Sequence, residues 1–294
     1  MMRAPLLLLA VLAHPAPVSA LPCAPAPGAI CAGGEAISEA DLVARLGAAD
    51  IAILGERHDN PVHHEWQAKL VAALAPKGLA FEMVPRAKEA AANEARAAGG
   101  DLEAALDWAH SGWPDWSMYA PIFAAAPEAR IAGGGVEREA LMQATKEGAA
   151  AAFGPGGGAY RLAERLDEPT MKSMLKEQED AHCGALPTAM LPGMVEAQQL
   201  RDAAFADAAL RLHAEGAAPV ALITGNGHAR TDRGAPLYLR RAAPDLKVVS
   251  LGMIELPEGV DPAEAEGGAP FDAVIYTLPF DRGDPCETFR KAPK

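Results

Sequence analysis

Two short segments place an imidazole just after an apolar run. Gly55-Glu56-Arg57-His58 follows the apolar residues 51–54, and Gly225-Asn226-Gly227-His228 follows the apolar residues 219–224. Short, branched apolar runs that end at glycine are typical of buried parallel strands leading into tight turns. In open α/β sheets, ligands bind at the carboxyl ends of such strands. We therefore expect His58 and His228 to meet at one edge of a sheet.

A carboxylate interrupts a third apolar run. Glu82 lies inside residues 78–84, which otherwise predict a buried strand, and an unpaired buried carboxylate is costly. Together Glu56, His58, Glu82 and His228 suit a divalent metal such as Zn or Mn. They also suit metal-free chemistry in which His58 acts as a general base oriented by a carboxylate. Each residue alone is equally compatible with an ordinary loop hydrogen bond, so the prediction depends on their convergence.

Further imidazoles and aromatic residues are secondary candidates. His64 lies on a helix that Asn60 caps and Pro61 begins. Residues 113–119 include Trp113, Met118 and Tyr119, which predict an apolar wall as readily as a packed edge of the core. His182 lies in a methionine-rich helical stretch, where methionine is typical of core filling.

The order of elements predicts an α/β fold with a mostly parallel central sheet flanked by helices. Further strands are expected at residues 130–135, 247–256 and 271–278. The glycine-rich residues 154–158 predict a loop, after which a helical insertion is expected at about 159–215. We expect a single domain over residues 38–294, preceded by an extended arm of residues 21–37.

Composition and the amino terminus bear on partners and compartment. The net charge of −13 and the absence of a Lys/Arg cluster argue against a nucleic-acid partner. Residues 1–20 have the pattern of a cleavable signal peptide cut near Ala20, which predicts a periplasmic or secreted protein. Cys23 lacks a convincing lipobox, so a lipoprotein anchor is the less favoured alternative.

The four cysteines favour two disulfides in an oxidising compartment, because no Cys-x-x-Cys pair is present. Three pairings are open. Proximity in the sequence suggests Cys23 with Cys31, which leaves Cys183 with Cys286.

Five motifs in this order resemble one protein family. They are Leu-Gly-Glu-Arg-His-Asp-Asn-Pro-x-His-His (54–64), Phe-Glu-Met (81–83), His-Cys-Gly-x-Leu-Pro (182–187), Met-Val-Glu-Ala-Gln (194–198) with Asp202, and Thr-Gly-Asn-Gly-His-Ala-Arg-x-Asp-x-Gly-x-Pro (224–236). The set resembles the ChaN-like haem-binding uptake proteins, which are similar to a wider grouping with Tiki, TraB and erythromycin esterase.

The resemblance implies an exported protein of bacterial iron or haem uptake that binds haem b noncovalently. It also implies a haem receptor or siderophore receptor system in the outer membrane as partner, and it allows a homodimer. A tyrosinate is the iron ligand type that the family implies, and tyrosine suits ferric iron. We expect Tyr119 in this role. The other expected haem contacts are His58, His64, Trp113, Met118, His182 and His228.

The wider grouping implies a different function, a hydrolase of the esterase or peptidase type. Glu56, His58, Glu82 and His228 would then be its catalytic or metal-binding residues. The sequence has no Gly-x-Ser-x-Gly elbow and no Cys-x-x-Cys-His haem attachment motif. A hydrolase would thus need an activated water. Haem binding is the primary prediction and hydrolysis is the alternative.

Overall fold

A computed structural model describes residues 21–262, 270–284, 286 and 287. Its sheet has the strand order β2-β1-β8-β7-β3-β6-β4-β5. The strands are β1 (Ile30–Ala32), β2 (Glu35–Ala36), β3 (Ile51–Glu56), β4 (Gly78–Pro85), β5 (Arg130–Gly135), β6 (Val220–Gly225), β7 (Val248–Glu255) and β8 (Ala273–Thr277). From β8 to β5 every neighbouring pair is parallel, whereas β1 pairs antiparallel with both β8 and β2. The predicted mostly parallel α/β fold is therefore confirmed.

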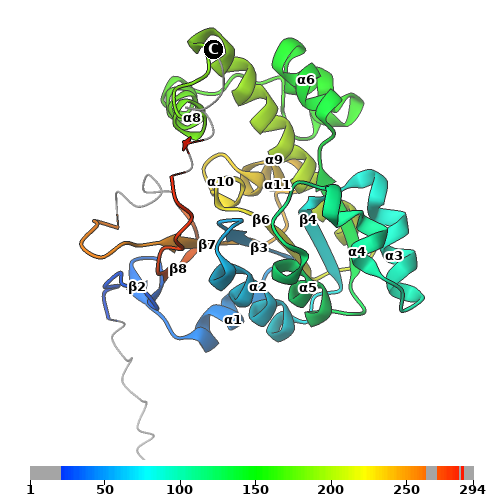
Figure 1. Cartoon of the computed structure of the whole chain (residues 1–294), viewed down its shortest axis with the longest axis vertical. Helices are drawn as coiled ribbons and strands as arrows, with labels where there is room; N and C mark the ends of the chain where they lie inside the picture. Colours follow the sequence, from blue (N-terminus) through cyan, green and yellow to red (C-terminus); the bar gives the residue numbers. More distant parts are fainter. Residues whose placement is uncertain (1–20, 263–269, 285, 288–294) are drawn as a thin grey trace, which may run out of the picture.

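Helices cover both faces of the sheet (Figure 1). They are α1 (Glu39–Gly47), α2 (Pro61–Leu74), α3 (Glu89–Ala97), α4 (Leu102–Leu106), α5 (Trp116–Ala125), α6 (Arg138–Glu147), α7 (Ala149–Phe153), α8 (Glu168–Ala181), α9 (Leu191–Ala214), α10 (Asn226–Ala229) and α11 (Ala235–Ala242). Four 3-10 turns join them: η1 (Arg86–Lys88), η2 (Trp108–His110), η3 (Pro155–Gly158) and η4 (Thr188–Met190).

The alternation of side chains along each strand creates two separate cores. In β3, Ala52 and Leu54 pack with residues of α1, α2 and α5, whereas Ile51 and Ile53 pack with residues of α9 and α11. Successive side chains of a strand point to opposite faces, so a central strand with helices on both sides must be apolar throughout. This is why residues 51–54 form a continuous apolar run.

The amino-terminal arm is more ordered than the sequence predicts. Residues 21–37 were expected to be an extended arm, but they contain the β1–β2 hairpin, which extends the sheet. The Cys23–Cys31 disulfide closes this hairpin, and its Cα atoms lie 5.7 Å apart. Residues 1–20, which carry the predicted signal peptide, lie outside the described residues.

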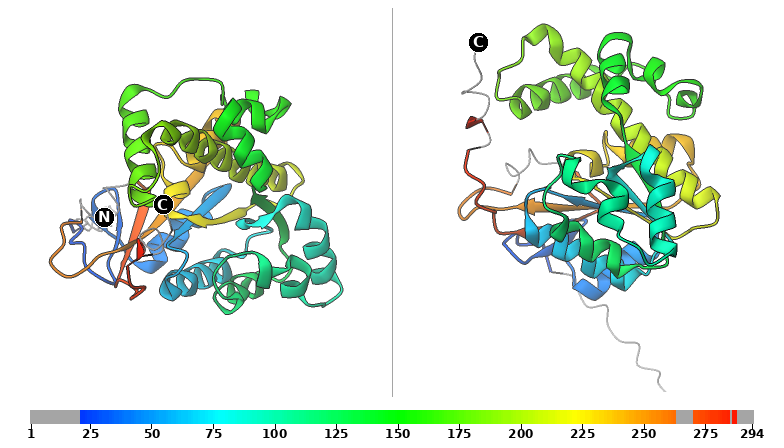
Figure 2. Two further views of the ribbon diagram at one scale, coloured as in Figure 1. Left: turned by 45° about the horizontal axis from the view of Figure 1, so that its top comes forward. Right: turned by 45° about the vertical axis from the view of Figure 1, so that its right-hand side comes forward.

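The helical region is longer than predicted. Helices begin at α6, about twenty residues before the expected insertion at 159–215, and the expected loop 154–158 contains the 3-10 turn η3. Figures 1 and 2 show α6, α8 and the amino-terminal half of α9 standing beyond the edge of the sheet. The carboxyl-terminal half of α9 returns to the sheet, where Leu212 packs beside Gly78 at the start of β4. Among the described residues, no helix is long and apolar enough to cross a membrane.

Candidate functional site

Three adjacent parallel strands bring the predicted residues together. β6 lies between β3 and β4, and Glu56 is in register with Gly225. Because parallel strands end at the same edge, the side chains of Glu56, His58, Glu82 and His228 converge there. Gly225 lets the His58 ring lie close to β6, since a Cβ atom on it would lie 2.8 Å from His58 Nε2 and would displace the ring.

The Glu82 carboxylate is the centre of the site. Its Oε1 lies 3.8 Å from His58 Nε2 and 3.6 Å from His228 Nε2. Its Oε2 accepts hydrogen bonds from the Thr224 hydroxyl at 2.7 Å and the Gly225 N–H at 2.8 Å. The carboxylate that the sequence placed inside an apolar strand is thus fully partnered, which explains how its burial is tolerated.

Each imidazole is oriented from behind by a second carboxylate. His58 Nδ1 donates to Glu56 Oε1 at 2.7 Å, and His228 Nδ1 donates to Asp202 Oδ1 at 2.7 Å. Both rings therefore direct Nε2 towards Glu82. We call the Glu56–His58 pair the His58 arm and the Asp202–His228 pair the His228 arm. The two arms differ in exposure to solvent, because the His58 side chain is 33% exposed and the His228 side chain is 10% exposed.

A buried layer supports Glu56. The Tyr119 hydroxyl donates to Glu56 Oε1 at 2.8 Å, and Tyr119 itself is fully buried. His64 Nε2 donates to the His58 carbonyl at 2.9 Å, while its Nδ1 lies 3.2 Å from Glu56 Oε2. Its ring also meets the Tyr119 ring edge-on. His64 and Tyr119 thus lie behind the His58 arm instead of facing solvent.

The carboxylates of the site raise the pKa values of both imidazoles. Burial alone would lower the pKa of His58, but Glu82 and Glu56 together raise it to about 9. Burial likewise opposes protonation of His228, yet Glu82 and Asp202 raise its pKa. Burial favours the neutral form of Glu82, but His228 and His58 lower its pKa. Burial raises the pKa of Asp202 to about 6, despite the adjacent His228.

The thermal stability of the protein is expected to fall as the pH rises from about 7 to 10. The pKa of His58 is raised on folding from its ordinary 6.5 to about 9, so its stabilising contribution is complete below pH 6.5 and is lost through pH 9. Melting curves across this range would measure the fall. A His58→Gln variant should show a flatter profile, and parallel profiles for the two proteins would contradict the assignment.

Glu56, His58 and His228 border an open cleft of about 720 Å³, whereas Glu82 is buried and does not line it. Its floor is the strand edge and the β6–α10 turn, and its roof is α8, which contributes Ser173, Lys176, Glu177 and Asp180. Arg230 and Arg233 also line it. Arg233 holds the roof, because it donates to Ser173 at 2.7 Å and pairs with Glu177. The cleft has the size of a typical small-molecule or cofactor site, which is roughly 300–1,000 Å³.

The predicted haem contacts separate into three groups. His58 and His228 line the cleft, and Trp113 packs against His58 with ring centroids 4.9 Å apart. Tyr119 and His64 are buried behind Glu56, so the structure favours a supporting role for Tyr119 over the iron-ligand role expected from the sequence. Met118 is half-buried against the core, and His182 ends α8, where Nδ1 donates to the Gln178 carbonyl.

Within the described part of the chain, no group of three or more His, Cys, Asp or Glu side chains is arranged to hold a metal ion. Glu56, His58, Glu82 and His228 instead form a continuous network of hydrogen bonds and ion pairs.

Two contributors were noted in the sequence as motif residues but were not predicted as site residues. Asp202 orients His228, and Gln198, one turn earlier on α9, lies 3.2 Å from the same imidazole. The sequence shows that Gln198 and Asp202 lie on one face of a helix, but it does not show that this face meets His228. The roof residues of α8 carried no signal, because their contribution depends on where the helical region folds.

Replacing Tyr119 by Phe is expected to leave the fold intact and lower the free energy of unfolding by about 1–3 kcal/mol. The reason is that Glu56 would lose a buried hydrogen bond while the ring still packs against Trp108. Urea unfolding would measure the loss. Tyr276→Phe, at a half-buried position of β8, is the control expected to cost less, and an equal cost for both variants would contradict the role of Tyr119.

The comparisons with known proteins agree with this architecture. A model of the family described as haem-binding uptake, Tiki superfamily, ChaN matches residues 42–239. The structure described as cofacial heme binding to ChaN of Campylobacter jejuni has a TM-score of 0.63 and 20% sequence identity, over 84% of this chain and 95% of that chain. The type III effector HopBA1 has a TM-score of 0.43 and 16% identity, over 81% of this chain and 91% of that chain. No curated protein matches the chain.

The fold and the site define an α/β protein with a histidine and carboxylate network under a helical roof. The family model covers about two thirds of the chain, including every strand that contributes to the site. The chain belongs to the ChaN family of haem-binding uptake proteins in the Tiki superfamily.

Proposed function

We propose that this protein is an exported haem-binding protein of bacterial haem or iron uptake, and that haem binds noncovalently in the cleft beneath α8. Family membership is the observation that carries the proposal. The likeness to the Campylobacter jejuni ChaN structure agrees with it at the level of the fold.

The donor set of the cleft fits haem. His58 Nε2 lies 3.8 Å from Glu82, beyond hydrogen-bond distance, and its side chain is one-third exposed. Trp113 adds an aromatic surface beside the ring. Arg230, Arg233 and Lys176 line the cleft, each paired with a carboxylate (Asp232, Glu177 and Asp180), and would exchange these partners for the haem propionates.

In this proposal His58 is the iron-facing side chain and Glu56 fixes its orientation. Bound haem would supply an iron atom that the imidazole can bind, since histidine is an established ligand of haem iron. His58 must lose its proton before Nε2 can bind a metal, and Glu82 is the nearest base to receive it. His228 and Asp202 form the deeper arm, which keeps a positive charge beside Glu82 when His58 is neutral.

Export is supported by two features. Residues 1–20 carry a signal-peptide pattern, and all four cysteines form the pairs Cys23–Cys31 and Cys183–Cys286, as sequence proximity suggests. Disulfides persist in oxidising compartments such as the periplasm. Fractionation of a producing bacterium, followed by mass spectrometry of the mature amino terminus, tests this part. Intact residues 1–20 in the cytoplasmic fraction would refute it.

Titration of the purified protein with hemin tests haem binding. We expect a shifted Soret band that saturates at a defined stoichiometry, and affinity at least about tenfold weaker in His58→Ala, or ~1.4 kcal/mol. His213→Ala is the control, because this residue ends α9 near the start of β4, at the opposite edge of the sheet. No saturable shift would refute the proposal, and equal affinities for the two variants would move the site away from His58.

Partners follow from the same proposal. Cofacial heme binding by the Campylobacter jejuni protein leads us to propose that haem joins two copies of this chain. From the family's role in uptake we propose, separately, that a receptor system for haem or siderophores in the outer membrane donates the haem. Light scattering during the hemin titration tests the first point. A mass that stays at one copy through saturation would refute it.

Hydrolysis is the second candidate, favoured by one observation. Two imidazoles that line the cleft, each oriented through Nδ1 by a carboxylate, direct Nε2 to one shared buried carboxylate, that of Glu82. Such pairs perform general acid–base chemistry on water. Turnover of an ester and peptide panel that disappears in both His58→Ala and His228→Ala would support it, whereas rates unchanged by both substitutions would exclude it.

A further inference from the structure

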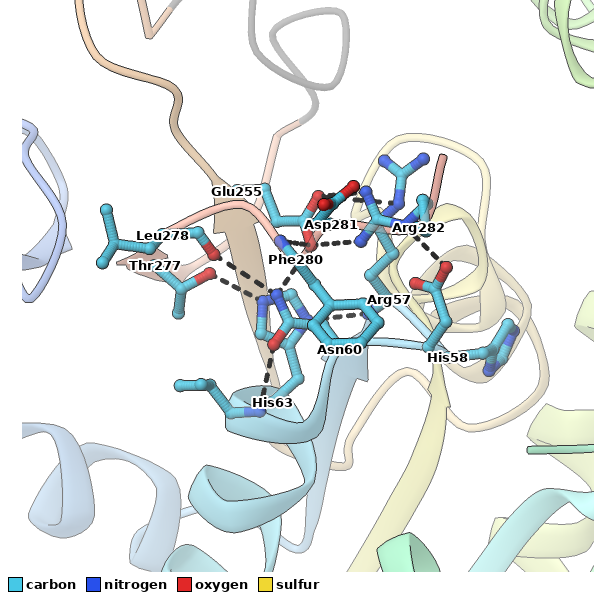
Figure 3. Close-up of polar contacts among 12 residues, drawn as sticks. Arg57, His58, Asn60, His63, Glu255, Thr277, Leu278, Phe280, Asp281 and Arg282 are labelled. Carbon is cyan, nitrogen blue, oxygen red and sulfur yellow. Dashed lines mark hydrogen bonds and ion pairs between the residues drawn. The ribbon is translucent and has the colours of Figure 1, made fainter. Parts of the chain in front are cut away.

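Residues 278–284, which follow β8 and which we call the tail, hold the loop that carries His58. Arg282 donates to Asp59 through Nε at 2.6 Å and to Glu255 through Nη1 at 2.7 Å, and its Nη2 also contacts Glu255 (Figure 3). Glu255 ends β7, and Asp59 is the residue after His58. A single guanidinium thus links the end of a rigid strand to the loop of residues 57–60, which we call the His58 loop.

Further hydrogen bonds tie the His58 loop to β7, and to β8 through His63 of α2. Asn60 Nδ2 donates to Glu255 at 2.6 Å, and the Phe280 N–H donates to the same Glu255 oxygen at 3.1 Å. The Arg57 N–H donates to His63 Nδ1 at 2.8 Å, and His63 Nε2 donates to Thr277 at 2.8 Å. Burial lowers the pKa of His63 to about 4, which keeps it neutral and able to accept from Arg57.

The geometry of these contacts defines what Arg282 does. Its guanidinium binds two carboxylates in a fixed fork, so it fixes their separation as well as neutralising them. Glu255 is also held by Asn60, which caps α2 through Val62. The His58 loop is therefore attached at Asp59 to the tail and at Asn60 to β7, while the backbone carbonyl of His58 is held by His64.

We propose that Arg282 is a positioning residue that holds the His58 loop at the cleft, and thereby sets how a ligand in the cleft meets the His58 imidazole. The identity of the ligand in this inference rests on the proposed haem function. The contacts of Arg282 with the His58 loop do not depend on it. Arg282 does not line the cleft. It acts through Asp59 and Glu255.

Arg211 provides a matched control for the experiment. It donates to Asp207 through Nε at 3.0 Å and to Glu89 through Nη1 and Nη2, which is the same fork on one aspartate and one glutamate. The two side chains have similar exposure, 18% for Arg282 and 22% for Arg211. Arg211 lies on α9 at a separate surface pocket with Arg130 and Asn93.

The test compares Arg282→Gln, Arg282→Lys and Arg211→Gln in the full chain loaded with hemin. Hemin transfer to excess apomyoglobin gives the dissociation rate, and the Soret band reports the iron environment. We expect about tenfold faster dissociation and an altered Soret band in Arg282→Gln, an intermediate effect in Arg282→Lys, and wild-type behaviour in Arg211→Gln at a comparable loss of melting temperature. Equal changes in Arg282→Gln and Arg211→Gln, or none in either, would overturn the proposal.

Hydrogen–deuterium exchange of the apo proteins separates positioning from haem binding. Peptides that cover the His58 loop should exchange faster in Arg282→Gln than in Arg211→Gln. This readout stands even if the wild-type protein binds no hemin, in which case the proposed function fails and the positioning role does not. Wild-type exchange of the loop in Arg282→Gln would refute the positioning role itself.

Discussion

Replacing Glu82 by Gln is expected to lower the free energy of unfolding by about 3–5 kcal/mol at pH 7, the usual cost of removing one partner from a buried ion pair. Glu82 raises the pKa values of both imidazoles it faces, so without its charge each ring would lose a carboxylate that favours its protonated form. Of these two rings, Glu56 hydrogen-bonds only His58 and Asp202 only His228.

The same substitution is expected to cost much less above pH 9, which distinguishes an electrostatic role from simple packing. A neutral imidazole that donates through Nδ1 has an unprotonated Nε2, and the side-chain amide introduced by Glu82→Gln can donate to it. Urea unfolding at pH 7 and pH 10 measures both costs. Glu89→Gln is the control, because its partner Arg211 does not titrate in this range. If the cost of Glu82→Gln did not depend on pH, the electrostatic account would be wrong.

Removing the Cys183–Cys286 disulfide is expected to have a comparable effect on stability. The bond joins residues 103 positions apart, and the chain-entropy model assigns about 4.7 kcal/mol to a loop of roughly that length. The Cys23–Cys31 bond spans only 8 positions, for which the same model gives about 2.5 kcal/mol. The double variant Cys183→Ser/Cys286→Ser should therefore be the less stable of the two disulfide variants.

The long disulfide also connects the roof of the cleft to the tail that holds the His58 loop. Cys183 follows directly after α8, and Cys286 lies four residues after Arg282. Unfolding both double serine variants in urea, each with the other disulfide intact, gives the two losses. The Cys183–Cys286 variant should in addition show faster hydrogen exchange in α8, and equal losses with an unchanged α8 would contradict this account.

The convergence at the sheet edge was predictable from the sequence. Residues 51–54 and 219–224 are apolar on both faces and end at glycine, so they indicate central parallel strands, and parallel strands end together. Glu82 was identified for a related reason, since a carboxylate inside a buried strand needs a partner. These inferences depend on local patterns that a single sequence contains.

Other contributions depend on contacts between distant segments and leave no local pattern. Arg282 is one arginine among many in the sequence, and only the register of β7 and β8 brings it to Asp59. Tyr119 was expected to face haem because of the nearby tryptophans, but Trp108 and Trp116 pack on each other and close the core over it. The position of α8 depends on the path of α9, which helical periodicity does not specify.

The unequal exposure of the two imidazoles sets the order in which a ligand reaches them. The His58 side chain is one-third exposed and the His228 side chain one-tenth, so a molecule arriving from solvent meets His58 first. Both rings line the cleft, so a ligand seated there contacts the two in sequence, the exposed ring before the more buried one.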